Sequence, residues 1–267
     1  MPQDGLAPVH RVVRAVAGHP GRLAVIGIYG ILTQHATPLE AFGLSTSCDT
    51  IARQLRTAMV DPGVDRVVLD IDSQGGSGFG LSELAAEIRN ARGTKPIVAV
   101  ANSMAASAAY WLAASCSEVF VAPSGVVGSI GMVAAHEDIG GALALAGINV
   151  TLVFAGKHKA DGNPYGPLGR EARDAMQADV DSYGRDFLRD VAAGRRVSID
   201  HVRRDFGEGR MLRGDAAAKV GMADGVATLD DVLRGTARPR SARLDASTLA
   251  RMPAALANAM RTLELLN

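Results

Sequence analysis

Cysteine is nearly absent from the sequence, which excludes a scaffold built on disulfides. Cys48 and Cys116 are the only two in 267 residues, and their spacing is not that of a metal site. Two isolated cysteines suit a reducing compartment. We therefore expect both to be small buried residues.

A surplus of charge is also lacking, because 28 Lys and Arg residues balance 28 Asp and Glu residues. No global charge attracts the protein to nucleic acid or to anionic lipid. The most apolar runs, 23–32 and 104–116, are too short to cross a bilayer. Charges and prolines interrupt residues 1–20, so no secretory signal core is visible there. We expect a soluble, cytoplasmic protein with no membrane anchor and no nucleic-acid partner.

The apolar residues that are present, 48% of the chain, are enough for a sizeable core. Predicted strands alternate with predicted helices, which is typical of an α/β fold with a largely parallel sheet. The strands are expected at 23–32, 67–72, 97–100, 118–123 and 148–155, and the main helices at 46–59, 81–91 and 168–193. We divide the chain into an N-terminal arm (1–20), one domain (21–235), and a linker with a C-terminal helix (236–267).

The stretch PIVAVANSMAASAAYWLAAS, residues 96–115, is the first candidate for chemistry. Its apolar, β-rich start and Ala-rich continuation predict a buried strand that leads into a helix. Ser107 lies near the start of that helix, where unpaired backbone N–H groups could stabilise a developing negative charge. Taken alone, the stretch is also compatible with a small residue in a tightly packed Ala/Ser helix, and that simpler interpretation is favoured.

Two further segments change this balance. The first is DIDSQGG, in which Gly75 and Gly76 follow a buried strand and can present backbone N–H groups. The second is GKHKADG, which places Lys159 after the strand expected at 148–155. A lysine can act as the base for a serine when burial lowers the lysine pKa. Ser129, in GSIG, could then orient the lysine by a hydrogen bond.

Taken in order, DIDSQGG, SMAASAAYW, GVVGSIGMV and GKHKADG resemble the signal peptide peptidase A family of Ser-Lys serine proteases. The resemblance covers roughly residues 21–235 and includes the later segment GRMLRGDAAAKVGMADGV. It implies a Clp protease/crotonase-like superhelix of ββα units. It also implies a serine endopeptidase that acts on polypeptides, forms a homo-oligomer, and needs no cofactor and no metal.

Carried over residue by residue, the resemblance implies that Ser107 is the nucleophile, Lys159 the general base and Ser129 the hydroxyl that orients the lysine. It implies an oxyanion hole made by the backbone N–H groups of Gly76 and Ala108.

Two departures from the family pattern bear on this hole. Gln74 stands where the family usually has proline, and Ala108 with Ala109 stand where it usually has two glycines. If position 108 required a positive φ, alanine would be strained there and the hole would be in doubt.

Because no membrane anchor is visible, the chain resembles the soluble phage and prophage branch, the capsid assembly (head maturation) proteases. The segments VIGIYGILTQ and DPGVDRVVLDIDS carry this narrower resemblance. It implies capsid or scaffold proteins as partners, and an assembling prohead as a place of action. A cytoplasmic, peptide-degrading relative of the signal peptide peptidases is the alternative.

Other interpretations remain open from the sequence. His136 and Asp138 could serve a Ser-His-Asp arrangement of the Clp protease type, and Lys157 competes with Lys159. A crotonase-like enzyme would instead use carboxylates such as Glu83 and Glu87, and an inactive scaffold or assembly subunit would use none of these residues.

Overall fold

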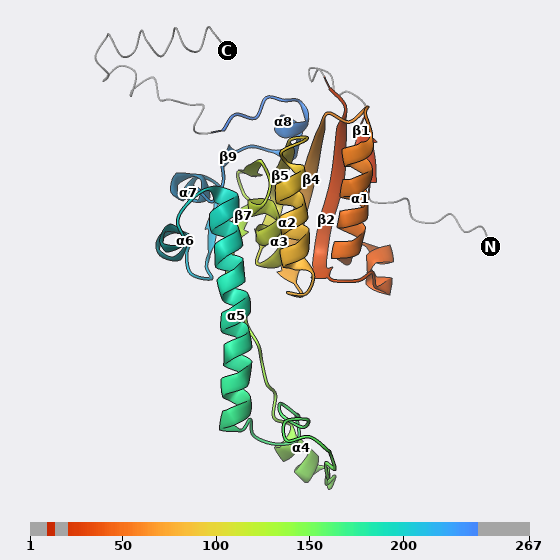
Figure 1. Cartoon of the computed structure of the whole chain (residues 1–267), viewed down its shortest axis with the longest axis vertical. Helices are drawn as coiled ribbons and strands as arrows, with labels where there is room; N and C mark the ends of the chain where they lie inside the picture. The colour runs from red at the N-terminus through yellow and green to blue at the C-terminus, as the bar shows by residue number, and fades with distance from the viewer. Residues whose placement is uncertain (1–9, 14–20, 240–267) are drawn as a thin grey trace, which may run out of the picture.

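The structure is a computed structural model that describes residues 10–13 and 21–239. The helix expected near the C-terminus, and all of the N-terminal arm except His10–Val13, lie outside the described residues. Figure 1 shows a body built on one sheet and a long arm that projects from it.

Helices and strands alternate along the described chain. The strands are β1 (His10–Val13), β2 (Leu23–Thr33), β3 (Ser45–Ser47), β4 (Arg66–Gly76), β5 (Ile97–Ala106), β6 (Glu118–Val121), β7 (Val126–Gly128), β8 (Met211–Arg213) and β9 (Gly225–Val226). The helices are η1 (Pro38–Phe42, 3₁₀), α1 (Cys48–Val60), α2 (Leu81–Ala91), α3 (Ala108–Ala114), α4 (Gly140–Leu145), α5 (Arg170–Arg195), α6 (Ile199–Asp205), α7 (Gly214–Val220) and α8 (Leu229–Leu233).

The sheet has the order β1-β2-β4-β5-β6-β9, and the pairs from β2 to β9 are parallel. β3 pairs with the end of β2 and β7 with the end of β5, so both extend the sheet at the carboxyl ends of its strands. β1 and β8 are antiparallel to their neighbours. The expected α/β class with a largely parallel sheet is therefore confirmed.

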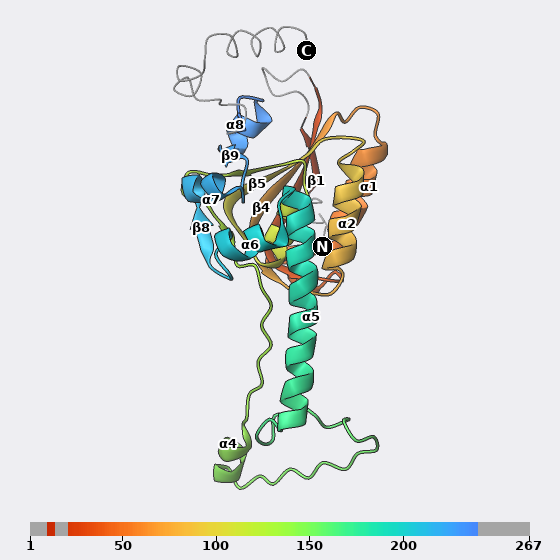
Figure 2. The same ribbon diagram turned by 60° about the vertical axis from the view of Figure 1, so that its left-hand side comes forward.

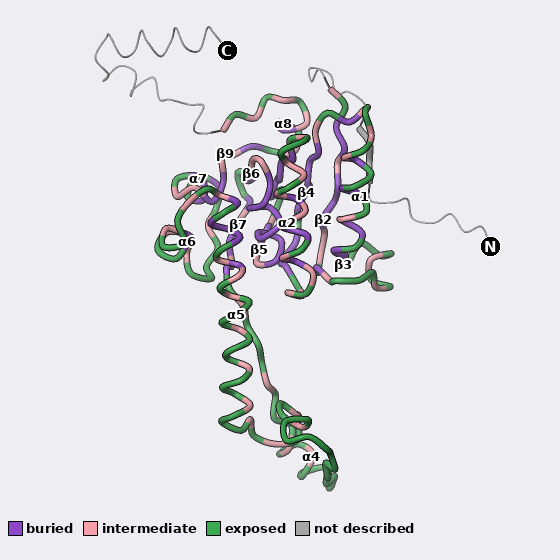
Figure 3. The backbone as a smooth tube through the Cα atoms, viewed as in Figure 1, coloured by how far each residue is buried: buried purple, intermediate pink, exposed green. Residues whose placement is uncertain are grey.

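The central strands are apolar on both faces, as expected for strands that are covered on both sides. In β5, Ile97 and Ala99 belong to the large cluster that α1, α2 and α3 cover. Val98 and Val100 belong to a smaller cluster on the opposite face, which α8 covers. Figure 3 shows this burial concentrated in the body, while the projecting arm is mostly exposed.

The arm consists of residues 132–182, which include α4 and the N-terminal part of α5 (Figures 1 and 2). The buried residues of α5 all lie in its C-terminal third: Phe187, Asp190, Val191, Ala192 and Gly194. Further out, the half-buried Met176 and Val180 face residues 132–136 across a cavity of about 510 Å³. The long helix is thus anchored in the body at one end only.

The strand expected at 148–155 is wrong, although the helix expected at 168–193 is present as α5. Residues 148–155 lie in the arm, form no strand, and are all exposed. Their β-branched and apolar side chains fit a pleated sheet, but no other described strand lies beside them to complete a hydrogen-bonded ladder.

None of the described helices is both long enough and apolar enough to cross a membrane.

Candidate active site

Ser107 lies between the end of β5 and the start of α3, in a backbone conformation that serine rarely adopts. Its φ is 51° and its ψ is −123°. Two hydrogen bonds hold it there: its N–H donates to the Gly128 carbonyl at 2.8 Å, and its carbonyl accepts from the Trp111 N–H at 3.1 Å. A serine on a strained turn between a strand and a helix is the geometry of an exposed nucleophile.

The glycine turn at the end of β4 lies directly against Ser107. Gly75 has a φ of 96°, and a Cβ atom at this position would lie 2.8 Å from the Ser107 Cβ and 2.9 Å from the Ala108 nitrogen. No residue other than glycine therefore fits there without displacing Ser107. β4 and β5 are parallel neighbours, so their carboxyl ends bring the two motifs together.

Two backbone N–H groups, those of Gly76 and Ala108, belong to the segments that flank Ser107. Ser77 donates its N–H to the Leu32 carbonyl of β2 at 2.9 Å, and alternate N–H groups of a strand face opposite edges. The Gly76 N–H therefore faces the other edge of β4, on the side of β5. The Ala108 N–H is the first of α3 and has no acceptor within its own helix.

The two departures from the family pattern are compatible with this geometry. Among the described residues, positive φ occurs outside glycine only at Ser107, Ser129, Arg196 and Glu208, so Ala108 is not strained. The strain falls on the serine before it. Gln74 is exposed, and β4 continues past it to Gly76.

Ser129 is the neighbour in sequence of a residue that is hydrogen bonded to Ser107. It directly follows Gly128, whose carbonyl accepts the Ser107 N–H, and its own N–H donates to the Arg210 carbonyl at 3.0 Å. Its φ is 55°, also in the left-handed region. β7 thus places a second hydroxyl group at the same edge of the sheet.

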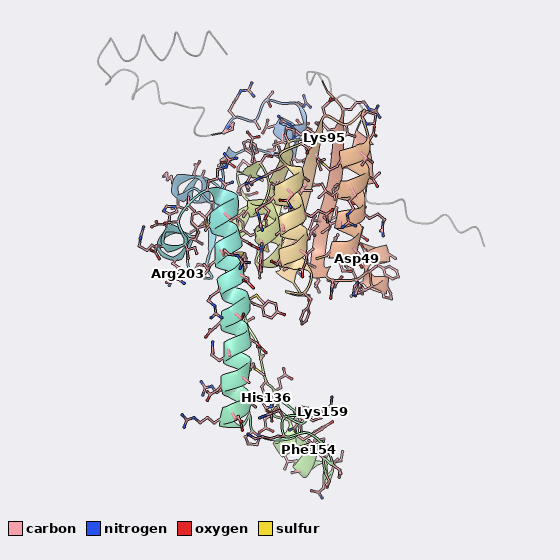
Figure 4. The ribbon with its side chains drawn as sticks, viewed as in Figure 1. Asp49, Lys95, His136, Phe154, Lys159 and Arg203 are labelled. Atoms are coloured by element: carbon pink, nitrogen blue, oxygen red, sulfur yellow. The ribbon has the colours of Figure 1, made fainter. Side chains whose placement is uncertain are left out.

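Lys159 is not brought to Ser107 within one chain. Figure 4 shows Lys159 near the far end of the arm, close to Phe154, whereas α3 lies in the body (Figure 1). Lys159 is exposed, and the apolar pocket expected around it is absent from the described residues. The neighbouring Lys157 donates to a Glu171 carboxylate oxygen at 2.7 Å, so its amine is held in an ion pair.

The alternative bases are no closer. His136 also lies on the arm (Figure 4), where its Nε2 is 2.8 Å from the Asn163 carbonyl oxygen. Asp138 accepts the Gly140 N–H at 2.8 Å instead of contacting His136. Of the two carboxylates of the crotonase-like alternative, Glu83 lies in the first turn of α2, and Glu87 accepts two hydrogen bonds from Arg56 at 2.7 Å each. These contacts do not support a Ser-His-Asp or a carboxylate mechanism.

A buried polar cluster fixes α3 from behind, and no motif in the sequence indicated it. Asp190 of α5, only 3% exposed, accepts the Trp111 Nε1–H at 2.9 Å and a guanidinium N–H of Arg89 at 3.2 Å. Trp111 also stacks on Phe187 with ring centroids 4.5 Å apart. The cluster joins α2, α3 and α5, and so supports the helix that begins after Ser107.

Metal binding has no support in the described part of the chain. It contains no group of three or more His, Cys, Asp or Glu side chains that could hold a metal ion.

The two cysteines are buried, as expected, and neither is a candidate nucleophile. Burial raises the pKa of Cys116 to about 12, and burial together with the nearby Asp49 carboxylate raises the pKa of Cys48 to about 11. Since the thiolate is the reactive form, neither thiol should react with Ellman's reagent at about pH 8 in the folded protein. We expect both thiols to react in guanidinium chloride. A fast reaction of either thiol without denaturant would show that it is not buried in the folded protein.

Comparison with known proteins gives a consistent assignment. The model of the family described as peptidase family S49 matches residues 89–242, which include Ser107, Ser129 and Lys159. The head-tail preconnector protein GP5 of Enterobacteria phage P21 is 34% identical over 244 residues, covering 91% of this chain and 48% of that protein. The capsid assembly protease C of Escherichia phage lambda is 33% identical over 225 residues, covering 83% of this chain and 51% of that protein.

The chain thus spans about half the length of these two phage relatives. Among solved structures, a mutant of ClpP1 from Listeria monocytogenes matches with a TM-score of 0.48 and 15% identity, covering 78% of this chain and 94% of that one.

Proposed function

The chain belongs to peptidase family S49, and from this premise we propose that it is a serine endopeptidase with Ser107 as its nucleophile. The observation that carries the proposal is the strained Ser107 turn, enclosed by the Gly75–Gly76 turn on one side and the start of α3 on the other. A packing serine in an Ala-rich helix has no need of a left-handed backbone.

The proposed reaction follows from this geometry. The Ser107 oxygen attacks the peptide carbonyl carbon while its proton passes to the neutral amine of Lys159. The Gly76 and Ala108 N–H groups bind the oxyanion that forms, and Ser129 orients the amine. The intermediate collapses to an acyl-enzyme as the ammonium of Lys159 returns the proton to the leaving amine. Water, deprotonated by the same lysine, then hydrolyses the ester.

We infer that Lys159 reaches Ser107 from a second copy of the chain. Neither the Ser107 hydroxyl nor the Lys159 amine has a hydrogen-bond partner among the described residues. The arm that carries the lysine has large apolar side chains at its surface: Leu145 is 93% exposed and Val153 is 95% exposed. Monomeric proteins rarely leave such surfaces uncovered, so we propose a homo-oligomer in which the arm packs on a neighbour.

The narrower proposals concern substrate and place. The names of the phage relatives refer to capsid assembly and to the head-tail connection. We propose that the substrates are capsid or scaffold proteins, and that the protein acts in the cytoplasm during head assembly.

Covalent labelling tests the nucleophile directly. We expect a fluorophosphonate probe to form one adduct on Ser107, located by peptide mass spectrometry, because only this hydroxyl combines a base with an oxyanion hole. The Ser107→Ala protein should remain unlabelled. Ser103→Ala, which removes an exposed serine of the same strand, should label normally.

An unlabelled Ser107 in the folded, oligomeric protein would favour an inactive assembly subunit. An adduct on another serine would refute the assignment of the nucleophile.

A further inference from the structure

Ser73 holds the glycine turn beside Ser107, although it is itself too buried to reach a substrate. It lies in β4 and is 1% exposed. The Ser73 hydroxyl donates to the Gly30 carbonyl at 2.6 Å and accepts the Gly75 N–H at 3.1 Å. One side chain therefore connects β2 to the turn.

The acceptor of this hydroxyl is itself fixed. Gly30 lies at an irregularity in β2, where the pairing with β4 shifts between Tyr29 and Ile31. Its φ is 66°, and a Cβ atom there would lie 2.2 Å from the Leu44 carbonyl oxygen. The bulge thus presses the Gly30 backbone against residues 44–45. A rigid carbonyl fixes the Ser73 hydroxyl, which leaves its oxygen to accept from Gly75.

We propose that Ser73 is a positioning residue, which sets the direction of the Gly76 N–H in the oxyanion hole. Gly75, which Ser73 holds, packs so closely that an added Cβ atom would meet both the Ser107 Cβ and the Ala108 nitrogen, and the peptide that follows it carries the Gly76 N–H. Two consecutive glycines have many accessible conformations. The turn therefore needs a hydrogen bond from another residue to hold it in one conformation. This inference rests on the proposed function, since it assigns a role within the same site.

The expected effect is on the chemical step. Without the hydroxyl, the Gly76 N–H can turn away from the position of the oxyanion, while the contacts that bind the substrate remain. We expect Ser73→Ala to lower kcat about 10- to 100-fold with little change in KM. Ser73→Thr keeps the hydroxyl and should recover most of the loss.

The matched control is Ser115→Ala. Ser115 is also fully buried and hydrogen bonded, donating to the Trp111 carbonyl at 3.0 Å, but it lies at the other end of α3. Both alanine variants remove one buried hydroxyl, so their loss of thermal stability should be similar. Only the Ser73 variant should lose kcat on fluorescein-labelled casein. Ser73→Cys, which is nearly isosteric but a weaker hydrogen-bonding group, replaces Ser73→Ala if that variant does not fold.

A pair of inhibitors separates positioning from a general structural role. A peptide aldehyde forms a hemiacetal with Ser107 whose oxygen occupies the oxyanion hole, whereas the corresponding peptide alcohol has no carbonyl group to attack and forms no oxyanion. We expect Ser73→Ala to weaken binding of the aldehyde by the same factor as kcat/KM, and to leave binding of the alcohol unchanged.

Equal weakening of both inhibitors, or a folded Ser73 variant with wild-type kcat, would overturn the inference while hydrolysis still depended on Ser107. Hydrolysis or labelling that did not depend on Ser107 would instead refute the proposed function.

Discussion

A mixed oligomer of Ser107→Ala and Lys159→Ala chains is expected to hydrolyse casein, although each variant alone should lose activity at least about a thousand-fold. Each homo-oligomer lacks either the nucleophile or the base at every site. In a mixed oligomer, some sites combine an intact Ser107 with a neighbour's intact Lys159. Random assembly of equal amounts gives about a quarter of the sites both groups. Co-expression with two different tags, followed by purification through both, removes the homo-oligomers, so the purified sample should have at least about a quarter of wild-type activity.

The outcome distinguishes a shared site from a self-contained one. If the arm folds back to place Lys159 against the Ser107 of its own chain, the mixed oligomer stays inactive. Lys157→Ala is the matched control, because Lys157 is also exposed on the same loop but is paired with Glu171. It should keep near-normal activity alone and in mixtures.

Replacing Asp190 by alanine is expected to lower the free energy of unfolding by about 3 to 5 kcal/mol, because it leaves the Arg89 charge without its buried partner. The Trp111 N–H also loses its acceptor. Urea denaturation followed by tryptophan fluorescence measures the change, and the single tryptophan of the chain lies in the cluster itself.

Asp186→Ala is the control for this measurement. Asp186 pairs with Arg189 at 2.6 Å on the same helix, but both side chains are largely exposed. Such pairs contribute about 0 to 1 kcal/mol. If the two variants were equally stable, the polar cluster would not be what joins α5 to α3.

The sequence was sufficient for the part of the site that neighbouring strands assemble. The motifs around Gly76, Ser107 and Ser129 follow β4, β5 and β7, and parallel pairing alone brings their carboxyl ends together. A strand-by-strand interpretation of the chain therefore brings the motifs of Gly76 and Ser107 together, whereas β7, which precedes Ser129, was not among the expected strands. The sequence was also sufficient for the α/β class, which depends on alternation of elements and not on any one boundary.

Residues 148–155 show the limit of interpreting the chain strand by strand. Their composition fits a strand, but a strand exists only where another lies beside it, and the periodicity of one segment does not show whether a partner is present. Lys159 follows this segment, so its position was expected from a sheet that does not include it. The helix expected at 168–193 is present as α5, but 3.6-residue spacing indicates an apolar face and not what covers it.

The roles of Ser73 and Asp190 were not predicted from the sequence. Ser73 lies in the motif DIDSQGG, but only the two glycines of that motif were given a role, and Asp190 is one of many charged residues on α5. Their importance depends on burial and on partners distant in the chain, Gly30 in one case and Trp111 in the other.

The backbone of Ser107 also has a cost for the stability of the fold. A non-glycine residue in a sparsely populated φ/ψ region costs about 1 to 3 kcal/mol, which glycine largely avoids. Ser107 and Ser129 both have positive φ, at neighbouring points of one edge. Glycine at either position should therefore relieve this strain, while it removes a hydroxyl that the proposed reaction uses. The two serines thus set the stability of the fold against the proposed activity at the same edge of the sheet.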